Sequence, residues 1–198
     1  MTASIILAHP RRGSFSHAIA EAAEQALRAG GTAVLCHDLY AEKFDPVMGA
    51  DEAASRVSAD PLIERHCAEI ATARIIVLVH PNWWSGPPAI LKGWADRVLR
   101  PGVAYGFASG DAGKGAPVGL LKAHKVLVFA SANMPREAEQ ALLGNPLETL
   151  WKKSVFAQCG VGDCELRIFS PLAAVDAVQR ELWLQEAARL CAQAAAKA

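Results

Sequence analysis

The amino-acid sequence predicts an α/β domain in which a five-stranded parallel sheet lies between two layers of helices. Short apolar runs, typical of strands buried on both faces, alternate with segments rich in alanine, leucine and glutamate, which favour helix. Right-handed crossovers place helices on both faces of such a sheet, so three layers are expected. We expect the strand order 2-1-3-4-5. In that order the loops after strands one and three flank the switch point, where such sheets bind ligands.

Five apolar runs are the predicted strands, at residues 4–8, 32–36, 74–80, 125–131 and 165–169. Helices are expected at residues 17–31, 51–72 with a break at Asp60-Pro61, 89–99, 146–159 and 175–196. Two connections are long: residues 103–123, with a Gly-rich run at 110–115, and residues 133–145. The first of these is too long for a simple turn, and we interpret it as a functional excursion.

The composition favours one domain over residues 1–198 and argues against several kinds of partner. The chain is 52% hydrophobic and carries 20 basic and 20 acidic residues. Balanced charge without a basic cluster argues against nucleic-acid binding. No stretch approaches the length of a transmembrane helix, and the N-terminus lacks the basic region of a signal peptide. We therefore expect a cytoplasmic protein that is not embedded in a membrane.

The cysteines and histidines do not form a recognisable metal motif. None of the five cysteines has C-x-x-C spacing, and no two of the six histidines form an H-x-x-x-H pair. Free cysteines are usually buried. We expect buried structural thiols and no metal.

The loop after the first predicted strand has the residue types that bind phosphate. His9, Arg11, Ser14, Ser16 and His17 precede a helix, whose first N–H groups and dipole favour an anion. The alternative is that a serine merely caps the helix and the arginines are merely solvated. Neither G-x-G-x-x-G nor G-x-x-x-x-G-K-[ST] occurs, so the loop is neither a dinucleotide fingerprint nor a Walker loop.

The loop after the third predicted strand is stiff and aromatic. It contains Pro81, Trp83, Trp84 and a Pro87-Pro88 pair, which lose little entropy on ordering and offer flat apolar faces. We interpret this loop as one wall of a site for a planar ligand. The alternative is that both tryptophans are core or interface residues. Adjacent side chains on an extended chain point to opposite sides, which argues against burying both.

Four motifs carry a family resemblance: A-H-P at 8–10, S-F-S-H at 14–17, H-P-N-W-W-S-G-P-P-A-I-L-K-G-W at 80–94 and A-Y-G-F at 104–107. Together they resemble the flavodoxin-like NAD(P)H:quinone oxidoreductases, the DT-diaphorase family and its shorter bacterial relatives. The resemblance implies a flavodoxin-like fold and a bound FMN or FAD. It also implies hydride transfer from NAD(P)H to a quinone in a ping-pong cycle, within a homodimer.

The resemblance also implies roles for particular residues. His9, Phe15, Ser16 and His17 would meet the flavin phosphates and ribityl chain. The segment Pro81, Asn82, Trp83 and Trp84 would contact the edge of the isoalloxazine ring.

The expected catalytic residues are Trp84, Tyr105 and Phe107. By the resemblance, Trp84 stacks where nicotinamide and quinone take turns, and the other two reach the partner subunit's site. Ser131, Ala132 and Asn133 stand where better-known members have Thr-Thr-Gly-Gly against the flavin.

The chain departs from the family pattern in two further ways. The tyrosine and histidine of a proton relay have no counterpart in residues 136–143, so no general acid is assigned. The long C-terminal extension of the animal enzymes is missing, which makes FMN a candidate beside FAD.

Two other functions are alternatives. A flavin-binding electron carrier, or a regulatory subunit of a membrane transporter, has a similar sequence, but carriers are usually smaller and acidic. A serine hydrolase is excluded because Ser85 does not lie in a G-x-S-x-G motif.

Overall fold

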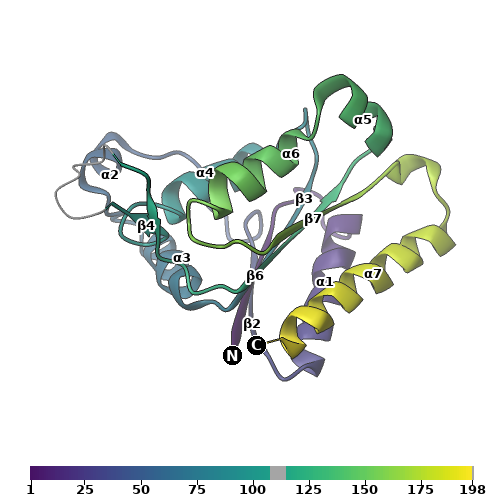
Figure 1. Ribbon diagram of the computed structural model, residues 1–198, viewed down its shortest axis with the longest axis horizontal. Helices are drawn as coiled ribbons and strands as arrows, with labels where there is room; N and C mark the ends of the chain where they lie inside the picture. Colours follow the sequence, from purple (N-terminus) through teal and green to yellow (C-terminus); the bar gives the residue numbers. More distant parts are fainter. Residues whose placement is uncertain (108–114, 198) are drawn as a thin grey trace.

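Five parallel strands form the centre of the molecule (Figure 1). Their order is β2-β1-β3-β6-β7. The computed structural model describes residues 1–107 and 115–197. The strands are β1 (Thr2–Leu7), β2 (Ala33–Asp38), β3 (Ile75–Pro81), β6 (Lys125–Ser131) and β7 (Cys164–Phe169). The predicted order 2-1-3-4-5 is therefore confirmed, and each predicted strand end lies within two residues of the observed one.

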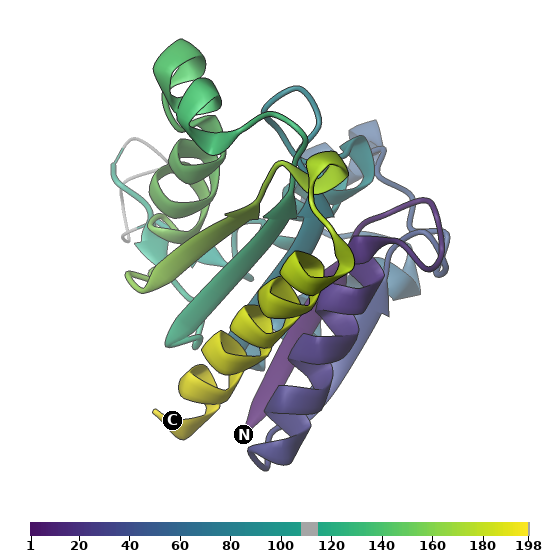
Figure 2. The same ribbon diagram turned by 90° about the vertical axis from the view of Figure 1, so that its right-hand side faces the viewer.

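Alternating side chains of the strands build two separate cores. In β1, Ile5 and Leu7 pack on one face of the sheet, whereas Ile6 packs on the other, and β3 alternates in the same way. The first face is covered by α1 (Phe15–Ala29) and α7 (Ala177–Ala196), which lie side by side (Figure 2). The opposite face is covered by α3 (Pro61–Thr72), α4 (Ala89–Val98) and the π-helical segment η1 (Thr149–Phe156).

Most helices begin and end close to the predicted places. Ser14 is the N-cap of α1, and its side chain accepts a hydrogen bond from the backbone N–H of His17. The break predicted at Asp60-Pro61 separates α2 (Ala50–Ser55) from α3, and Asp60 caps α3. The short α6 (Pro146–Glu148) continues into η1, as the predicted helix over 146–159 requires.

The prediction of a long connection over residues 133–145 is wrong. Residues Arg136–Leu143 form helix α5, which begins directly after Pro135. Every residue of this segment, R-E-A-E-Q-A-L-L, is a strong helix former. The break at Asn133-Met134-Pro135 ends β6, but it does not prevent a helix from starting at Arg136.

The other long connection contains a small antiparallel pair of strands. β4 (Tyr105–Gly106) pairs with β5 (Val118–Gly119). Most of the Gly-rich run, residues 110–114, lies outside the described residues.

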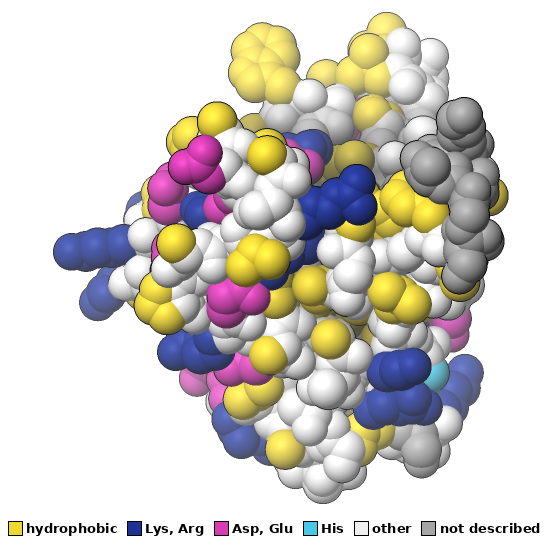
Figure 3. Space-filling model, turned by 90° about the vertical axis from the view of Figure 1, so that its left-hand side faces the viewer, with side chains coloured by type: hydrophobic (Ala, Val, Ile, Leu, Met, Phe, Trp, Pro, Cys, Tyr) yellow, Lys and Arg dark blue, Asp and Glu magenta, His cyan; other side chains and the backbone are white. Residues whose placement is uncertain are grey.

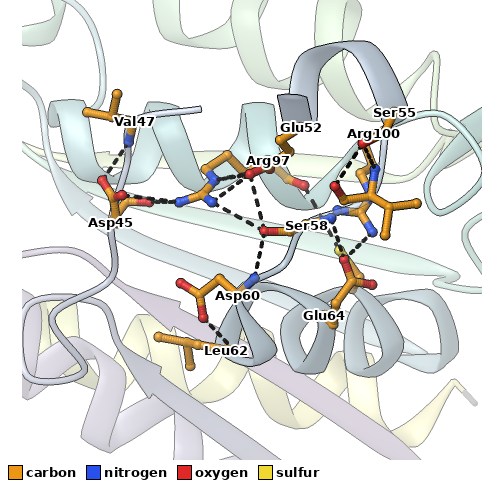
Figure 4. A network of polar contacts seen from close by, with 12 residues as sticks. Asp45, Val47, Glu52, Ser55, Ser58, Asp60, Leu62, Glu64, Arg97 and Arg100 are labelled. Atoms are coloured by element: carbon orange, nitrogen blue, oxygen red, sulfur yellow. Dashed lines mark hydrogen bonds and ion pairs between the residues drawn. The ribbon is translucent and has the colours of Figure 1, made fainter. Parts of the chain in front are cut away.

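A buried ion pair ties the chain between β2 and α3 to helix α4. Arg97 contacts Glu52 at 2.6 Å through Nη2, and both side chains are less than a tenth exposed. The same guanidinium donates to Ser58 and to the carbonyl oxygen of Asp45 (Figure 4). Charge-assisted hydrogen bonds of this kind are strong when both groups are desolvated. They hold residues 45–58, which include the short helix α2, against the body of the fold.

Four of the five cysteines are buried, at positions 67, 159, 164 and 191. The prediction of buried thiols is wrong for Cys36, which is exposed. This residue lies on β2, an edge strand. Within residues 1–107 and 115–197, no helix combines the length and apolar character needed to cross a membrane.

Candidate functional site

The predicted binding residues meet at the carboxyl edge of the sheet. Three segments lie there: residues 9–17 follow β1, residues 81–85 begin at the last residue of β3, and residues 131–134 begin at the last residue of β6. The backbone N–H of Asn82 donates to the carbonyl oxygen of Ser131 at 2.7 Å, which joins the second segment to the third. Parallel pairing of the three strands causes this convergence, because it places all their carboxyl ends at one edge.

A polar cavity of about 460 Å³ lies beside the loop after β1. Its lining includes His9, Arg11, Ser14, Ser16, Ser131, Asn133 and Arg180. Ser16 Oγ is buried and has no hydrogen-bond partner among the described residues. A buried hydroxyl without a partner costs free energy unless a ligand or water satisfies it. The cavity, its two cationic side chains and the start of α1 therefore suit an anionic ligand.

Two histidines of this loop are held in defined orientations. The ring nitrogen Nδ1 of His9 accepts a hydrogen bond from the backbone N–H of Arg11 at 3.1 Å. Burial lowers the pKa of His9, and the nearby charges of His17 and Arg11 lower it further. The neutral ring then carries its hydrogen on Nε2, which can donate to a ligand. His17 lies between Ser14 Oγ at 2.9 Å and Asp38 Oδ2 at 3.3 Å, which fix its ring.

The ring of Phe15 packs into the core between α1 and α7. It lies 6.1 Å from the Phe169 ring and 6.0 Å from that of Trp183, measured between centroids. Phe15 also lines the polar cavity. Its packing anchors the first turn of α1 beside the cavity.

The two tryptophans lie in a tight two-residue turn. Trp83 and Gly86 exchange backbone hydrogen bonds of 2.9 and 3.0 Å, and Trp84 and Ser85 between them have φ of 51° and 59°. Left-handed backbone at two successive residues is the signature of a type I′ turn. The turn leaves Trp84 completely exposed and Trp83 half exposed, 6.4 Å from the His9 ring. The alternative in which both tryptophans are core residues is therefore wrong.

A second cavity, of about 620 Å³, lies beside this turn. Its walls are mainly apolar and include Trp84, Met134, Leu143 and Pro146, together with the polar side chains of Asn82, Asn133 and Glu139. Asn133 also lines the polar cavity, so the two cavities are adjacent. Together they suit a ligand with an anionic end and a planar end.

Tyr105 and Phe107 lie at a different place from Trp84. Their rings are 5.9 Å apart and nearly perpendicular. Tyr105 lines a groove of about 400 Å³ between α2, α4 and η1. On this face, hydrophobic side chains surround a hollow that also contains basic groups (Figure 3). Within this chain alone, the structure does not bring these two aromatic residues to the turn of Trp84.

Several residues at the edge of the sheet had no signal in the sequence. Glu139 comes from α5, Arg180 from α7, and Asp38 from the end of β2. The helix-forming composition of residues 136–143 was a usable sign of α5, but nothing local indicates that Glu139 faces the turn. Its partners are 54 and 57 residues away in sequence.

A cluster of titratable groups lies apart from this edge. Atoms of His37, Glu42 and His66 are close enough to share a metal ion. However, Nδ1 of His66 accepts a hydrogen bond from the Trp94 indole at 3.0 Å. The neutral His66 ring then carries its hydrogen on Nε2, which points at Glu42 and has no lone pair for a metal. The cluster is a hydrogen-bond network.

Comparisons with known proteins agree with this geometry. The model of a protein family described as having a flavodoxin-like fold matches residues 1–194. An NAD(P)H oxidoreductase of Haemophilus influenzae is 33% identical over 191 residues, which cover 93% of this chain and 91% of that protein. The chain belongs to the flavodoxin-like NAD(P)H:quinone oxidoreductase family.

Other members of the family extend the comparison. An FMN-dependent NADH:quinone oxidoreductase of Ruegeria pomeroyi is 30% identical over 86% of this chain and 89% of its own length. The NAD(P)H dehydrogenase [quinone] 1 of Cavia porcellus is 36% identical, but the match covers 54% of this chain and 46% of that protein. Among solved structures, the NAD(P)H:quinone oxidoreductase of Methanothermobacter marburgensis has a TM-score of 0.80 and 26% identity, covering 97% of this chain and 98% of that one.

Proposed function

We propose that this chain is a flavin-dependent NAD(P)H oxidoreductase that reduces quinones or similar planar acceptors. The observation that carries the proposal is the pair of adjacent cavities that share Asn133. One is polar, with cationic side chains and an unsatisfied serine hydroxyl, and the other is apolar beside an exposed tryptophan. An FMN or FAD has a matching phosphate end and planar end.

The cofactor would be held by residues from all three segments. Ser14, Ser16 and Arg11 are suited to its phosphate, with His9 and His17 beside them. Pro81, Asn82, Trp83, Ser131 and Ala132 are suited to the edge of its ring. When bound, the flavin supplies the redox chemistry, accepting hydride from NAD(P)H and passing two electrons to the acceptor.

The residues of the chain bind the cofactor, orient the reactants and keep water away from them. Nε2–H of His9 can donate a hydrogen bond to the cofactor, because the other ring nitrogen, Nδ1, accepts the hydrogen bond from Arg11. Trp84 offers a flat apolar face against which a nicotinamide or a quinone can stack in turn. Met134, Leu143 and Pro146 give that position an apolar surround. Once a ligand covers this apolar wall, the local dielectric falls, which strengthens the electrostatic contacts that orient the reactants.

The proposal is tested by cofactor content and turnover. We expect purified protein to be yellow, to release FMN or FAD identifiable by mass, and to oxidise NADH or NADPH with a quinone as acceptor. FMN is the cofactor that the Ruegeria relative's description favours. Colourless protein that binds neither flavin when it is added would contradict the proposal. Flavin binding without steady-state quinone turnover would favour the carrier or regulatory alternative.

We also infer that two copies form a homodimer through the groove that Tyr105 lines. Its walls combine apolar residues such as Leu99, Leu150 and Val155 with charged ones such as Arg56 and Lys92. Covering this groove removes apolar surface from water. The family resemblance implies that Tyr105 and Phe107 would then reach the partner's site. Light scattering on the eluted protein tests this inference. A monomeric mass with full turnover would contradict it.

That residues 1–198 form one domain, and that the protein is cytoplasmic, both stay predictions.

A further inference from the structure

One carboxylate from α5 holds both sides of the turn that carries Trp84. Oε1 of Glu139 accepts a hydrogen bond from Asn82 Nδ2 at 2.8 Å and another from Ser85 Oγ at 2.9 Å. Asn82 stands just before the turn, and Ser85 is the residue that follows Trp84 within it. A single oxygen atom therefore joins the two sides of the turn to a helix that follows a different strand.

The turn needs such a clamp because its own backbone is unfavourable. Trp84 and Ser85 both have positive φ, a region that residues other than glycine rarely adopt. Conformations of this kind persist only where the surroundings hold them. Trp84 is completely exposed, so packing of its ring does not hold it.

The position of Glu139 suits a clamp for the acceptor cavity. Glu139 is only 5% exposed. A buried carboxylate is costly unless donors satisfy it, and here one amide and one hydroxyl both donate to Oε1. Glu139 also lines the apolar cavity together with Trp84 and Met134.

We propose that Glu139 is a positioning residue, which holds the turn of residues 83–86 so that Trp84 forms a wall of the acceptor cavity. The link to acceptors rests on the proposed function, whereas the clamp itself rests on the hydrogen bonds. Removing the carboxylate frees the turn, and Trp84 then samples directions that do not face the cavity.

The test compares four variants of the full-length protein. Glu139→Ala removes the clamp, and Glu139→Gln keeps a carbonyl oxygen that can accept both hydrogen bonds. Ser85→Ala removes one of the two bonds. Glu137→Ala, an exposed residue of the same helix, is the matched control.

The first readout is hydrogen–deuterium exchange of the peptide covering residues 82–87, in protein with and without bound flavin. Trp83 and Gly86 donate the hydrogen bonds of the turn, so their amides report its opening. We expect faster exchange in Glu139→Ala and, to a smaller extent, in Ser85→Ala. Glu139→Gln and Glu137→Ala should match the wild type. Unchanged exchange in Glu139→Ala would overturn the proposal, and if that variant does not fold, unchanged exchange in Ser85→Ala would do so.

The second readout is steady-state kinetics with a quinone. We expect Glu139→Ala to lower kcat/KM for the quinone by about tenfold, with Glu139→Gln near wild type. An equal loss in both variants would overturn the positioning role, because it would show that the charge matters and the clamp does not. Absence of quinone turnover in the wild type, with the exchange pattern as expected, would overturn the proposed function and leave the clamp supported.

Discussion

The indole Nε1–H of Trp151 donates a hydrogen bond to Nε2 of His80 across 3.2 Å, in the interior between η1 and the end of β3. The other ring nitrogen, Nδ1, lies 2.9 Å from the carbonyl oxygen of Pro81 and donates to it. An indole is only a donor, so both contacts are satisfied by the neutral imidazole. Burial lowers the pKa of His80 to about 4, and the hydrogen bond to Pro81 offsets only part of that effect.

Stability should fall as pH falls from about 6.5 to about 4, because of His80. The folded pKa lies below that of the unfolded chain, so the unfolded state takes up the proton first. The contribution lost across this window is about 3 kcal/mol. Urea unfolding at pH 7, 5.5 and 4 measures it. His80→Gln should flatten this part of the profile, and a variant with the same slope as the wild type would contradict the assignment.

Metal ions should not stabilise the protein through the His37, Glu42 and His66 cluster. Burial opposes a charge on His37, but hydrogen bonds and charges from Glu42 and Glu69 outweigh it and raise its pKa. The hydrogen bond from Trp94 leaves no lone pair on His66 Nε2. We expect zinc and EDTA to leave Tm unchanged. Zinc that raises Tm in the wild type, and not in His66→Ala, would contradict this expectation.

Removing Arg97 should destabilise the fold strongly. Its partner Glu52 would remain buried without a counter-charge, and breaking a buried ion pair in this way costs about 3–5 kcal/mol. Urea unfolding of Arg97→Ala measures the loss. Asp96→Ala is the matched control, because its pair with Lys92 is half exposed on the same helix and should contribute less than about 1 kcal/mol. If Arg97→Ala and Asp96→Ala lost the same free energy of unfolding, burial would not be the reason that the Arg97 pair matters more.

Gly93→Ala should destabilise the contact between α4 and the chain before α2. A Cβ at this position would overlap the carbonyl oxygen and Cβ of Pro46. We expect a loss of about 1–3 kcal/mol, the usual cost of overpacking. Gly49→Ala is the control, because no atom of the described residues, apart from its own chain neighbours, lies within 4 Å of a Cβ built there. A thermal midpoint unchanged by Gly93→Ala would show that Pro46 moves away freely.

Trp84→Ala should lower turnover and leave the fold stable. The residue is completely exposed, so its removal should change the free energy of unfolding by less than about 0.5 kcal/mol. Loss of a stacking face should lower kcat/KM for the quinone by about tenfold. Val57→Ala, another exposed apolar residue, controls for surface effects. Unchanged turnover with a large fall in Tm would instead support a structural role for Trp84.

The sequence determined the sheet, the strand order and the two loops that flank its switch point. These depend on short local patterns: runs of Ile, Val and Leu for the strands, and Ser14 before a helix for the first loop. Such patterns act within a few residues of one another and can be read along the chain. The aromatic turn also had a local sign in Trp83, Trp84 and the prolines after them.

Tertiary structure alone decided how the turn of residues 83–86 is held and which way the Trp84 ring faces. Glu139 meets Asn82 across 57 residues of sequence, and Trp94 fixes the tautomer of His66 across 28. Contacts of this kind arise from the way the layers pack and leave no periodic trace in the sequence. The sequence therefore predicts a role for Trp84, whereas only the fold shows the hydrogen bonds by which Glu139 holds its turn.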